Sequence, residues 1–263
     1  MLGTGQDITE IQTAQQQLVE RTHALETSNA ELQRFAYVTS HDLQEPLRKI
    51  TTFASLLERE VNGEMSESGR IYMDKIVQSA GRMQRLIDDI LAFSSLRDFN
   101  EGYVPTDLNV VVKQVISDLE TRIEATGAVI QFDKLPVIDA IPSQMEQLFQ
   151  NLISNAIKFS RKGERPVVTI TSKLVSVDAI DNYNLVDDTT LNQRGFTYNW
   201  GREQFVQIEV IDNGIGFDEA YAEKIFEIFQ RLHSNMDGTG IGLAICKKIA
   251  DNHHGTISAY GAQ

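Results

Sequence analysis

Cysteine and basic residues are both scarce in this chain of 263 residues. The one cysteine, Cys246, excludes a disulfide within the chain and is typical of a reducing compartment. Because Cys246 lies in an apolar segment, we expect it to pack in the core rather than to react. Lys and Arg number 24 against 37 Asp and Glu, which gives a net charge of −13. Since binding to nucleic acid usually needs a basic face, we expect no nucleic acid partner.

Long hydrophobic runs are absent as well. No apolar stretch approaches the roughly 20 residues that cross a bilayer, and the first residues do not follow the pattern of a signal peptide. We therefore expect no membrane contact from this chain and a cytoplasmic location, which leaves room for a membrane anchor elsewhere in a full-length protein. The length suits one large domain or two modest ones.

The N-terminal region carries a heptad repeat. Apolar side chains recur every seven residues in one row, and the row three residues earlier is mostly polar. The apolar row consists of Ile11, Leu18, Leu25 and Leu32. This pattern predicts a parallel coiled coil of modest stability, in which Asn29 in the seam fixes the register. A single amphipathic helix lying on a globular domain would give the same pattern.

The stretch FAYVTSHDLQEPLRKI, residues 35–50, places a histidine beside an aspartate within a helical pattern. An imidazole next to a carboxylate is a nucleophile with a possible base at hand, although a lone pair of this kind is usually a surface feature. With Leu43 as the first heptad position, His41 falls at the sixth, which points to solvent. Pro46 leaves the carbonyl of Asp42 without its helical partner, so we expect the helix to bend or loosen there.

A second amphipathic helix is expected after Asn62 and Gly63, beginning near Ser66. Its apolar stripe consists of Met73, Ile76, Ala80, Met83, Ile87 and Ile90. Two long helices joined by a short turn form a hairpin, and so thin a unit could not bury its own stripes. We therefore expect a homodimer in which two hairpins make a four-helix bundle.

The pattern changes to mixed helix and strand from Thr106 onward. A helix is expected from about Ser143, which would cap it. On this helix Asn151, Asn155 and Lys158 are spaced four and three residues apart and share one face. Two carboxamides and an ammonium suit a metal-bound polyphosphate, although a polar helix face is usually just solvated. The other expected elements are a helix over about 107–126 and strands near 128–132, 166–175 and 204–211.

The last of these strands runs into DNGIGF, residues 212–217. Two closely spaced glycines, Gly214 and Gly216, let the backbone pass close to a flat ligand, and the Asp212 carboxylate can accept a hydrogen bond from that ligand. A simple tight turn is the alternative. The segment 177–201 between the strands has no chemistry that we can assign.

A second glycine-rich stretch precedes an apolar helix near the end of the chain. With Gly238, Gly240 and Gly242, backbone N–H groups and a helix N-terminus converge, and this geometry binds phosphate. The stretch lacks the Gly-Lys-Ser/Thr of a Walker A loop, and no strand precedes it as in a Rossmann fingerprint. The histidines outside the His-Asp pair, His23, His253 and His254, are expected at the surface.

Five stretches in this order resemble the boxes of the sensor histidine kinases of two-component signalling. SHDLQEPL resembles the phosphoacceptor box, NLISNAIKFS the asparagine box, DNGIGF the first glycine box, FEIFQRL the phenylalanine box and GTGIGLAI the second glycine box. The resemblance covers almost the whole chain from about Gln33, and HDLQEPL and FQRLH are closest in style to phytochrome-like kinases. GTGQDITE resembles the tail of a PAS sensor domain, which implies an upstream sensor in the full-length protein.

The resemblance implies an α+β fold. A long antiparallel helical hairpin, part of a four-helix bundle in the dimer, would precede an α/β sandwich of the Bergerat ATP-binding type. It divides the chain into a sensor-domain tail with a coiled-coil signalling helix (1–32), a dimerisation and histidine phosphoacceptor domain (33–97), a linker (98–105) and a catalytic ATP-binding domain (106–263).

The resemblance also implies roles for single residues. His41 would receive the γ-phosphate of ATP, and Asp42 would orient or deprotonate its ring. Asn155 would ligate Mg²⁺, and Asp212 would bind the amino group of adenine. The other implied ATP-binding residues are Asn151, Lys158, Gly214, Gly216, Phe217, Gly238, Thr239, Gly240, Gly242 and Leu243.

The implied function is an ATP- and Mg²⁺-dependent autokinase that phosphorylates His41 and passes the phosphoryl group to an aspartate of a response regulator. One alternative is an ATPase of the same superfamily that does not phosphorylate histidine. Such hydrolases carry a water-activating glutamate four residues before the metal-binding asparagine, and here that residue is Asn151, which cannot act as a base. Another alternative is a dimeric scaffold that senses nucleotide without catalysis.

Three departures from the family pattern carry expectations. Glu45 stands where kinases that also dephosphorylate their partner usually have Thr or Asn, so we expect weak phosphatase activity; efficient dephosphorylation of a phosphorylated partner would contradict this. The lid, about 233–237, is shorter than usual, so we expect nucleotide to be held loosely. After GTISAYGAQ the family normally continues into another strand, so we expect an exposed sheet edge.

Overall fold

The computed structural model of the chain describes Gln16, Ser40, Val61 and residues 42–59, 66–96, 102–176, 204–232 and 238–261. The expected coiled coil, the segment 177–201 and the short lid lie outside the described residues. The chain divides into two compact units, Met1–Ser95 and Leu96–Gln263. Among the described residues, no helix is long and apolar enough to cross a membrane.

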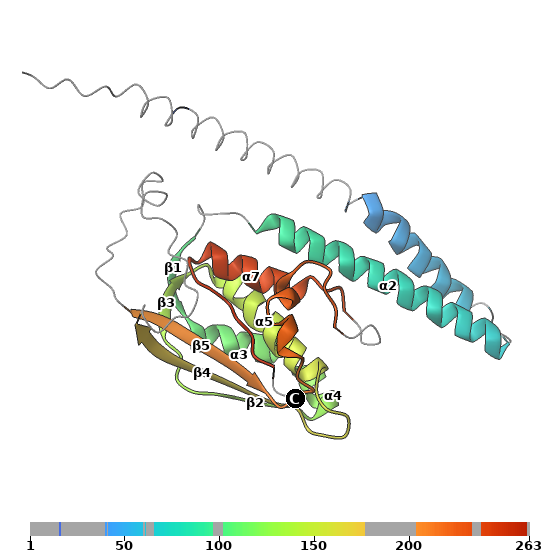
Figure 1. Ribbon diagram of the computed structural model, residues 1–263. Coiled ribbons are helices and arrows are strands. Elements are labelled where there is room, and N and C mark those ends of the chain that lie inside the picture. Colours follow the sequence, from blue (N-terminus) through green and yellow to red (C-terminus); the bar gives the residue numbers. More distant parts are fainter. Residues whose placement is uncertain are drawn as a thin grey trace, which may run out of the picture. The chain divides into compact units, whose positions relative to one another are not determined.

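The first unit contains two helices of a hairpin, residues 42–59 and α2 (Glu67–Ser95) (Figure 1). The first of them continues through Pro46. Ser66 caps α2, because its Oγ accepts a hydrogen bond from the N–H of Gly69 at 3.1 Å. The apolar residues buried in the hairpin are Leu47, Ala54, Met73, Ala80 and Ile87.

Half of the apolar rows of this hairpin are exposed. In α2 the buried residues Met73, Ala80 and Ile87 lie seven residues apart. The apolar residues between them, Ile76 and Met83, are each 47% exposed. On the first helix the row at the first and fourth heptad positions, counted from Leu43, is exposed as well. Its exposed apolar side chains are Leu43, Ile50, Phe53 and Leu57, between 44% and 67% exposed. One hairpin therefore buries only one side of each helix.

The second unit is built on a three-stranded sheet with the order β2-β4-β5. Its strands are β2 (Val129–Phe132), β4 (Val167–Ser176) and β5 (Gln204–Asp212). β2 and β4 are parallel, and β4 and β5 are antiparallel, with Val168 opposite Asp212 at the end of the ladder. A separate antiparallel pair consists of β1 (Val104–Asp107) and β3 (Val137–Ala140).

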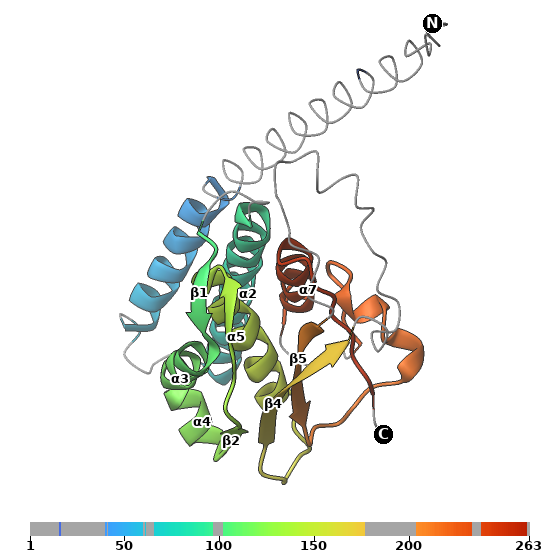
Figure 2. The same ribbon diagram turned by 90° about the vertical axis from the view of Figure 1, so that its left-hand side faces the viewer.

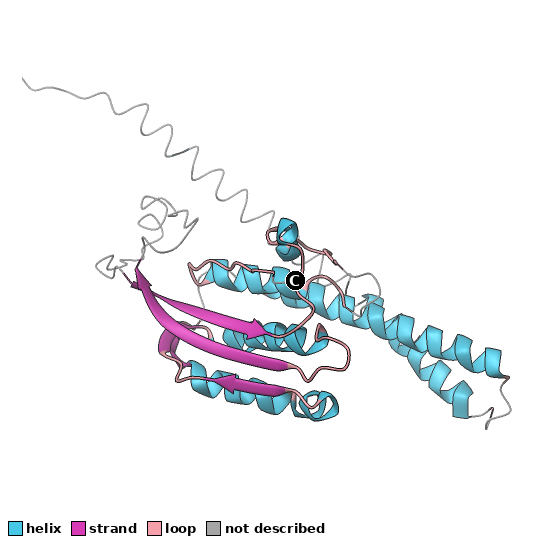
Figure 3. Ribbon diagram, turned by 60° about the horizontal axis from the view of Figure 1, so that its bottom comes forward, coloured by secondary structure: helices cyan, strands magenta, loops and turns pink. Residues whose placement is uncertain are grey.

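Three helices cover one face of the sheet (Figures 1 and 3). They are α3 (Leu108–Asp118), α5 (Pro142–Lys158) and α7 (Gly242–Asn252), and α5 lies between the other two (Figure 2). Their apolar stripes meet the inward side chains of β4. This core includes Val112, Val115, Phe149, Ile153, Ile157, Val168, Ile170, Ile245 and Ile249. α5 therefore packs against a helix on each side and against the sheet.

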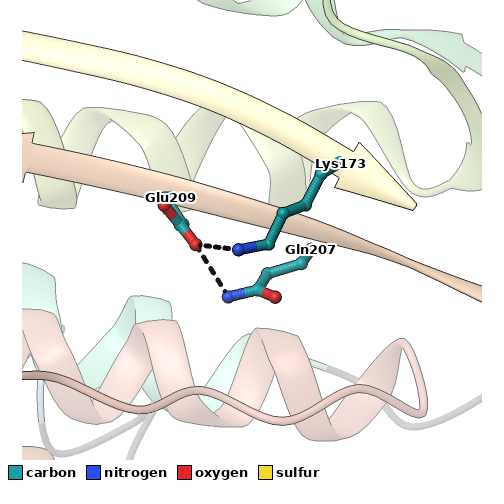
Figure 4. Close-up of polar contacts among 3 residues, drawn as sticks. All are labelled: Lys173, Gln207 and Glu209. Atoms are coloured by element: carbon teal, nitrogen blue, oxygen red, sulfur yellow. Dashed lines mark hydrogen bonds and ion pairs between the residues drawn. The ribbon is translucent and has the colours of Figure 1, made fainter. Parts of the chain in front are cut away.

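The opposite face of the sheet carries polar side chains. Lys173 on β4 forms an ion pair with Glu209 on β5 at 2.8 Å, and Gln207 donates to the same Glu209 oxygen at 2.9 Å (Figure 4). The alternation of apolar and polar residues along the two strands therefore matches a sheet with one helix-covered face.

Several local features differ from the expectations. The helix expected over 107–126 is broken at Leu119 into α3 and α4 (Glu120–Thr126). β1 and β3 were not predicted, because strands of four residues give little periodicity. Val104 and Pro105, expected in the linker, belong to β1. Ser143 is not the cap of α5, because Pro142 is the first helical residue and Ile141 is the N-cap. A proline in the first turn is favourable, since its missing N–H has no helical partner to lose.

His253, expected at the surface, is half-buried at the end of α7, and both of its ring nitrogens are bonded. Its Nε2 accepts a hydrogen bond from the N–H of Ile141 at 3.1 Å, and its Nδ1 lies 2.8 Å from the carbonyl oxygen of Ile249. Only the neutral tautomer with its proton on Nδ1 can make both bonds. Next to it, Asn252 donates to Gln144 at 3.3 Å, so the end of α7 is tied to the start of α5 at two points.

This arrangement predicts a pH dependence of stability. Burial lowers the pKa of His253 from its usual 6.5. As pH falls, the unfolded chain therefore binds the proton first, and the free energy of unfolding falls between pH 6.5 and the lowered folded value. Above that window the contribution is fully present. In His253→Gln we expect a loss of about 1 kcal/mol at pH 7.5 and a smaller loss at pH 5.5, measured by urea unfolding. Equal losses at both pH values would contradict the assignment.

Candidate functional site

The polar face expected on α5 lies at the edge of the packed core. Asn151, Asn155 and Lys158 are half-buried, while Phe149 and Ile153 of the same helix are fully buried. Packing on the apolar side therefore fixes the direction in which the three polar side chains leave the helix.

Asn151 faces the first turn of α7. A Cβ on Gly242 would lie 3.4 Å from Asn151 Oδ1, so the two helices come close at a residue without a side chain. The amide nitrogen of Asn151 is buried, and the side chain bonds to the buried thiol of Cys246 on α7. The carboxamide is therefore held against α7 from within the core, with its oxygen toward Gly242.

Lys158 reaches the second glycine-rich stretch from the other end of this face. The Lys158 ammonium lies close to the backbone of Gly238, since a Cβ there would be 2.6 Å from Nζ. The same Nζ lies 4.3 Å from the centroid of the Phe159 ring, a cation–π contact. The ammonium is therefore held between α5 and the backbone that leads into α7.

Gly240 packs the second glycine-rich stretch against the backbone of Phe229. Its φ is +77°, and a Cβ there would lie 2.8 Å from the carbonyl carbon of Phe229. Its carbonyl oxygen accepts a hydrogen bond from the N–H of Phe229 at 2.9 Å. Phe229 has a φ of +66°, a strained value for a bulky residue, which this close packing maintains.

The N-terminus of α7 completes the phosphate-type geometry. Ile241 is its N-cap, and no side chain caps the helix. The helix dipole and the first-turn N–H groups favour an anion there. This end of α7 faces the side chain of Asn151 across Gly242.

Asp212 ends β5 beside the C-terminus of α5. Its Oδ1 accepts a hydrogen bond from the N–H of Gly214 at 2.8 Å. A Cβ on Gly214 would lie 2.6 Å from the carbonyl oxygen of Phe159, and that oxygen accepts from the N–H of Ile215 at 2.9 Å. Gly216, with a φ of +67°, then turns the chain. The first glycine turn is thus packed directly on the residue after Lys158.

A pocket of about 380 Å³ lies next to this turn, a volume within the range of small-molecule sites. Its lining consists of Ile215, Gly216, Phe217, Asp218, Tyr221, Gln230, Arg231 and Leu232. Gly216 and Phe217 are the predicted site residues that it includes, and Asp212 is not part of its lining. The pocket is therefore a neighbour of the Asp212 turn rather than the place where the polar groups converge.

The structure thus brings Asn151, Lys158 and the two glycine stretches together around one helix. Asn155 shares their face, and its carbonyl oxygen accepts the N–H of Phe159 at 2.9 Å. Thr239 contributes through its Oγ1, which accepts from the N–H of Ile241 at 3.4 Å. Leu243 lies half-buried in the first turn of α7. His41 lies outside the described residues, and Asp42 is exposed on the first helix of the other unit.

Sequence reasoning missed two polar residues that hold the first glycine turn. Arg161 donates from Nε to the carbonyl oxygen of Gly214 at 3.0 Å, and the side chain of Asn213 bonds to the backbone before β4. Nothing in the sequence indicates the role of Arg161, because a basic residue after a helix is common. For Asn213 the sequence gives only a weak indication, its position between Asp212 and Gly214.

Cys246 behaves as expected of a core residue. It is buried in α7, and burial raises the pKa of its thiol to about 12. A thiol with this pKa stays protonated at neutral pH and is a poor nucleophile.

Comparison with known proteins identifies both units. Residues 31–99 match the family described as His Kinase A (phospho-acceptor) domain. Residues 140–263 match the family described as Histidine kinase-, DNA gyrase B-, and HSP90-like ATPase. The chain is 39% identical over 243 residues to cyanobacterial phytochrome A from Nostoc sp. (strain PCC 7120), which covers 92% of this chain. The chain spans 28% of the length of that relative.

Two solved structures share the fold. Full-length ShkA in complex with AMPPNP matches 86% of this chain and 42% of its own, with a TM-score of 0.57 and 24% identity. Histidine kinase ThkA in complex with the response regulator protein TrrA matches 90% of this chain and 61% of its own, with a TM-score of 0.51 and 19% identity. The expected fold class, a helical hairpin followed by a mixed α/β ATP-binding domain, is confirmed.

Proposed function

The chain belongs to the sensor histidine kinases of two-component systems, and on this basis we propose that it is an ATP-dependent histidine autokinase. A ring nitrogen of His41 forms a bond to the γ-phosphorus of ATP while the bond to the bridging oxygen breaks and ADP leaves. Asp42 orients the ring or takes its proton. The observation that carries the proposal is the convergence of Asn151, Lys158 and both glycine stretches around α5, in a chain that also has a His-Asp pair.

In this proposal the second unit works mainly by position and charge, as phosphoryl transfer requires. The Lys158 ammonium and the N-terminus of α7 offset charge on the phosphates. Asp212 accepts a hydrogen bond from the amino group of adenine, while Gly214 and Gly216 let the base approach the backbone.

The same residues fit a magnesium ion. Among the described residues, no group of three or more His, Cys, Asp or Glu side chains could hold a metal. Since Mg²⁺ prefers oxygen ligands and is commonly bound with substrate phosphates, the amide oxygen of Asn155 would supply one ligand and the phosphates others. The ion would neutralise charge that develops on the γ-phosphoryl group.

Hydrolysis of ATP as the main activity fits the site less well. In ATPases of this superfamily a glutamate activates water at the position that Asn151 occupies. A carboxamide cannot take a proton at neutral pH, and the Oδ1 of Asn151 is turned toward Gly242. We therefore place transfer to His41 above both hydrolysis and a non-catalytic nucleotide-sensing scaffold.

The phosphoryl group would pass to an aspartate of a response regulator. The solved complex of ThkA with a response regulator supports this class of partner. We also propose an upstream sensor domain, because the chain spans 28% of its phytochrome relative, and a cytoplasmic location, where ATP is available. The expected domain limits 1–32 and 33–97 remain our proposal. In place of the expected 98–105 and 106–263, we propose that the linker ends before Val104 and that the catalytic domain begins there, at the first residue of β1.

The first unit would act as a homodimer. Phe53 is 67% exposed, and Ile50, Ile76 and Met83 are each 45–47% exposed on one hairpin. Rows of this kind, spaced like the buried rows beside them, suit a second copy of the same hairpin and hence a four-helix bundle. The match to a phosphoacceptor domain supports this assembly.

Incubation with γ-labelled ATP and Mg²⁺ tests the kinase proposal. We expect label that survives alkali and is lost in acid, because a phosphoramidate is acid-labile. His41→Gln should remove the label while leaving ATP binding intact, since His41 is not part of the second unit. His253→Gln, a change at a histidine outside the proposed chemistry, should retain labelling. Acid-stable label, label that persists in His41→Gln, or phosphate release without protein labelling would refute the proposal.

Light scattering tests the dimer. The wild-type chain should have twice the monomer mass of 29.5 kDa, and Phe53→Glu should shift it toward the monomer, because a charge cannot be buried in the apolar seam. Ser55→Glu is a matched control, since Ser55 is exposed on the same helix and outside the apolar rows. A dimer that is unaffected by Phe53→Glu would place the interface elsewhere.

A further inference from the structure

Asn213 uses its side chain to continue the β4–β5 pairing beyond the end of β5. Its Oδ1 accepts a hydrogen bond from the N–H of Val167 at 2.8 Å, and its Nδ2 donates to the carbonyl oxygen of Arg165 at 3.0 Å. Its backbone N–H donates to the carbonyl oxygen of Val167 at 3.3 Å. The carboxamide therefore bonds to the chain on both sides of Pro166.

These bonds hold Asn213, the residue after Asp212, to the start of β4. The other contacts near Asp212 act on Asp212 itself and on Gly214. The strand ladder fixes Asp212 itself opposite Val168. On the far side, Gly214 is packed on Phe159 and bonded by Arg161. Between these two points Asn213 is the link, and without its side chain only its backbone N–H, bonded to Val167, would hold the peptide units around Asp212 there.

The direction of the Asp212 carboxylate depends on this link. One of its oxygens, Oδ1, already accepts the N–H of Gly214 at 2.8 Å, which sets the side-chain rotamer relative to the turn. An ionised carboxylate has about four acceptor sites, so this bond leaves capacity for a donor on a ligand. If the peptide planes at Asn213 rotate, the Gly214 N–H moves and the carboxylate loses its fixed direction.

A fixed carboxylate is what distinguishes two purine bases. Adenine has an amino donor at the position where guanine has a carbonyl acceptor. A rigid acceptor binds the amino group of adenine and repels the carbonyl group of guanine. A site built to hydrogen-bond a donor strongly rejects an analogue that lacks this donor. A carboxylate that can turn toward water loses much of this discrimination.

We propose that Asn213 is a positioning residue that sets the preference of this site for adenine over guanine nucleotides. It acts through Asp212 and does not itself contact the base. The inference rests on the proposed function, because it takes Asp212 as the group that binds the base.

The test compares ATP and GTP as competitors of a fluorescent ATP analogue, with Mg²⁺ present and with the whole chain. In Asn213→Ala we expect ATP to bind about tenfold more weakly, the order of one lost bond to a charged group, while the affinity for GTP changes less than about twofold. The ratio of the two affinities is the readout. Partial unfolding weakens both nucleotides equally and cancels in this ratio.

Asn109 offers a matched control. Its Oδ1 accepts a hydrogen bond from the N–H of Leu135 at 2.9 Å, and its Nδ2 donates one to the carbonyl oxygen of Leu135 at 2.7 Å. Like Asn213, it therefore makes two hydrogen bonds from its carboxamide to the backbone. Asn109→Ala should lower the melting temperature without changing the ATP-to-GTP ratio. Asn213→Asp keeps an acceptor for Val167 and loses the donor to Arg165, so its ratio should lie between those of the wild type and Asn213→Ala.

Two results would overturn the inference. The first is an unchanged ratio in Asn213→Ala with a melting temperature lowered as in Asn109→Ala, which would make Asn213 a purely structural residue. The second is a wild-type chain that binds GTP as tightly as ATP. If that chain still transfers label from ATP to His41, the proposed kinase function stands and only the inference about Asn213 fails.

Discussion

The close approach of Gly214 to the carbonyl oxygen of Phe159 is the contact on which the rest of the site depends. A Cβ at residue 214 would lie 2.6 Å from that oxygen, and the N–H of the next residue, Ile215, bonds to it at 2.9 Å. Glycine is therefore the residue that lets the turn after β5 rest on the last turn of α5. Lys158 directly precedes Phe159. The turn that carries the proposed base-binding residue, Asp212, therefore packs next to the proposed phosphate-binding residue, Lys158, at the end of α5.

The other contacts of α5 extend this arrangement along the helix. Asn151, two turns before Lys158, meets the start of α7 at Gly242, and His253 at the end of α7 returns to Ile141 at the start of α5. α5 and α7 are thus tied at both ends. A positive helix end and an ammonium that are held in place can stabilise negative charge without reorganising, which is the main contribution that a protein makes to phosphoryl transfer.

The sequence predicts the long periodic elements well, and the short or tertiary features poorly. The helix of Asn151 and Lys158, the strand before Asp212 and the helix after Gly242 all follow from periodicity and glycine position, because many residues agree on each. β1 and β3 have four residues each and carry no such agreement. The start of α5 was missed because Ser143 is a good cap by type, whereas Pro142 fits the first turn and a distant histidine binds the N–H of Ile141.

Roles that depend on a partner far along the chain leave no pattern in the sequence. His253 reaches Ile141 across 112 positions, and Asn213 reaches Arg165 across 48, so neither role can be seen from neighbouring residues. The bond between the Asn151 side chain and the buried thiol of Cys246 is likewise a property of packing, since the two residues lie far apart in the sequence.

The central claim is that the two glycine stretches and the polar face of α5 form a single nucleotide site. Amide hydrogen exchange with and without a non-hydrolysable ATP analogue and Mg²⁺ tests it most directly, residue by residue. We expect slower exchange on nucleotide addition in both 212–217 and 238–243, and little change in β2 at the other edge of the sheet. Protection of only one glycine stretch, or protection confined to 230–232 beside the neighbouring pocket, would contradict it.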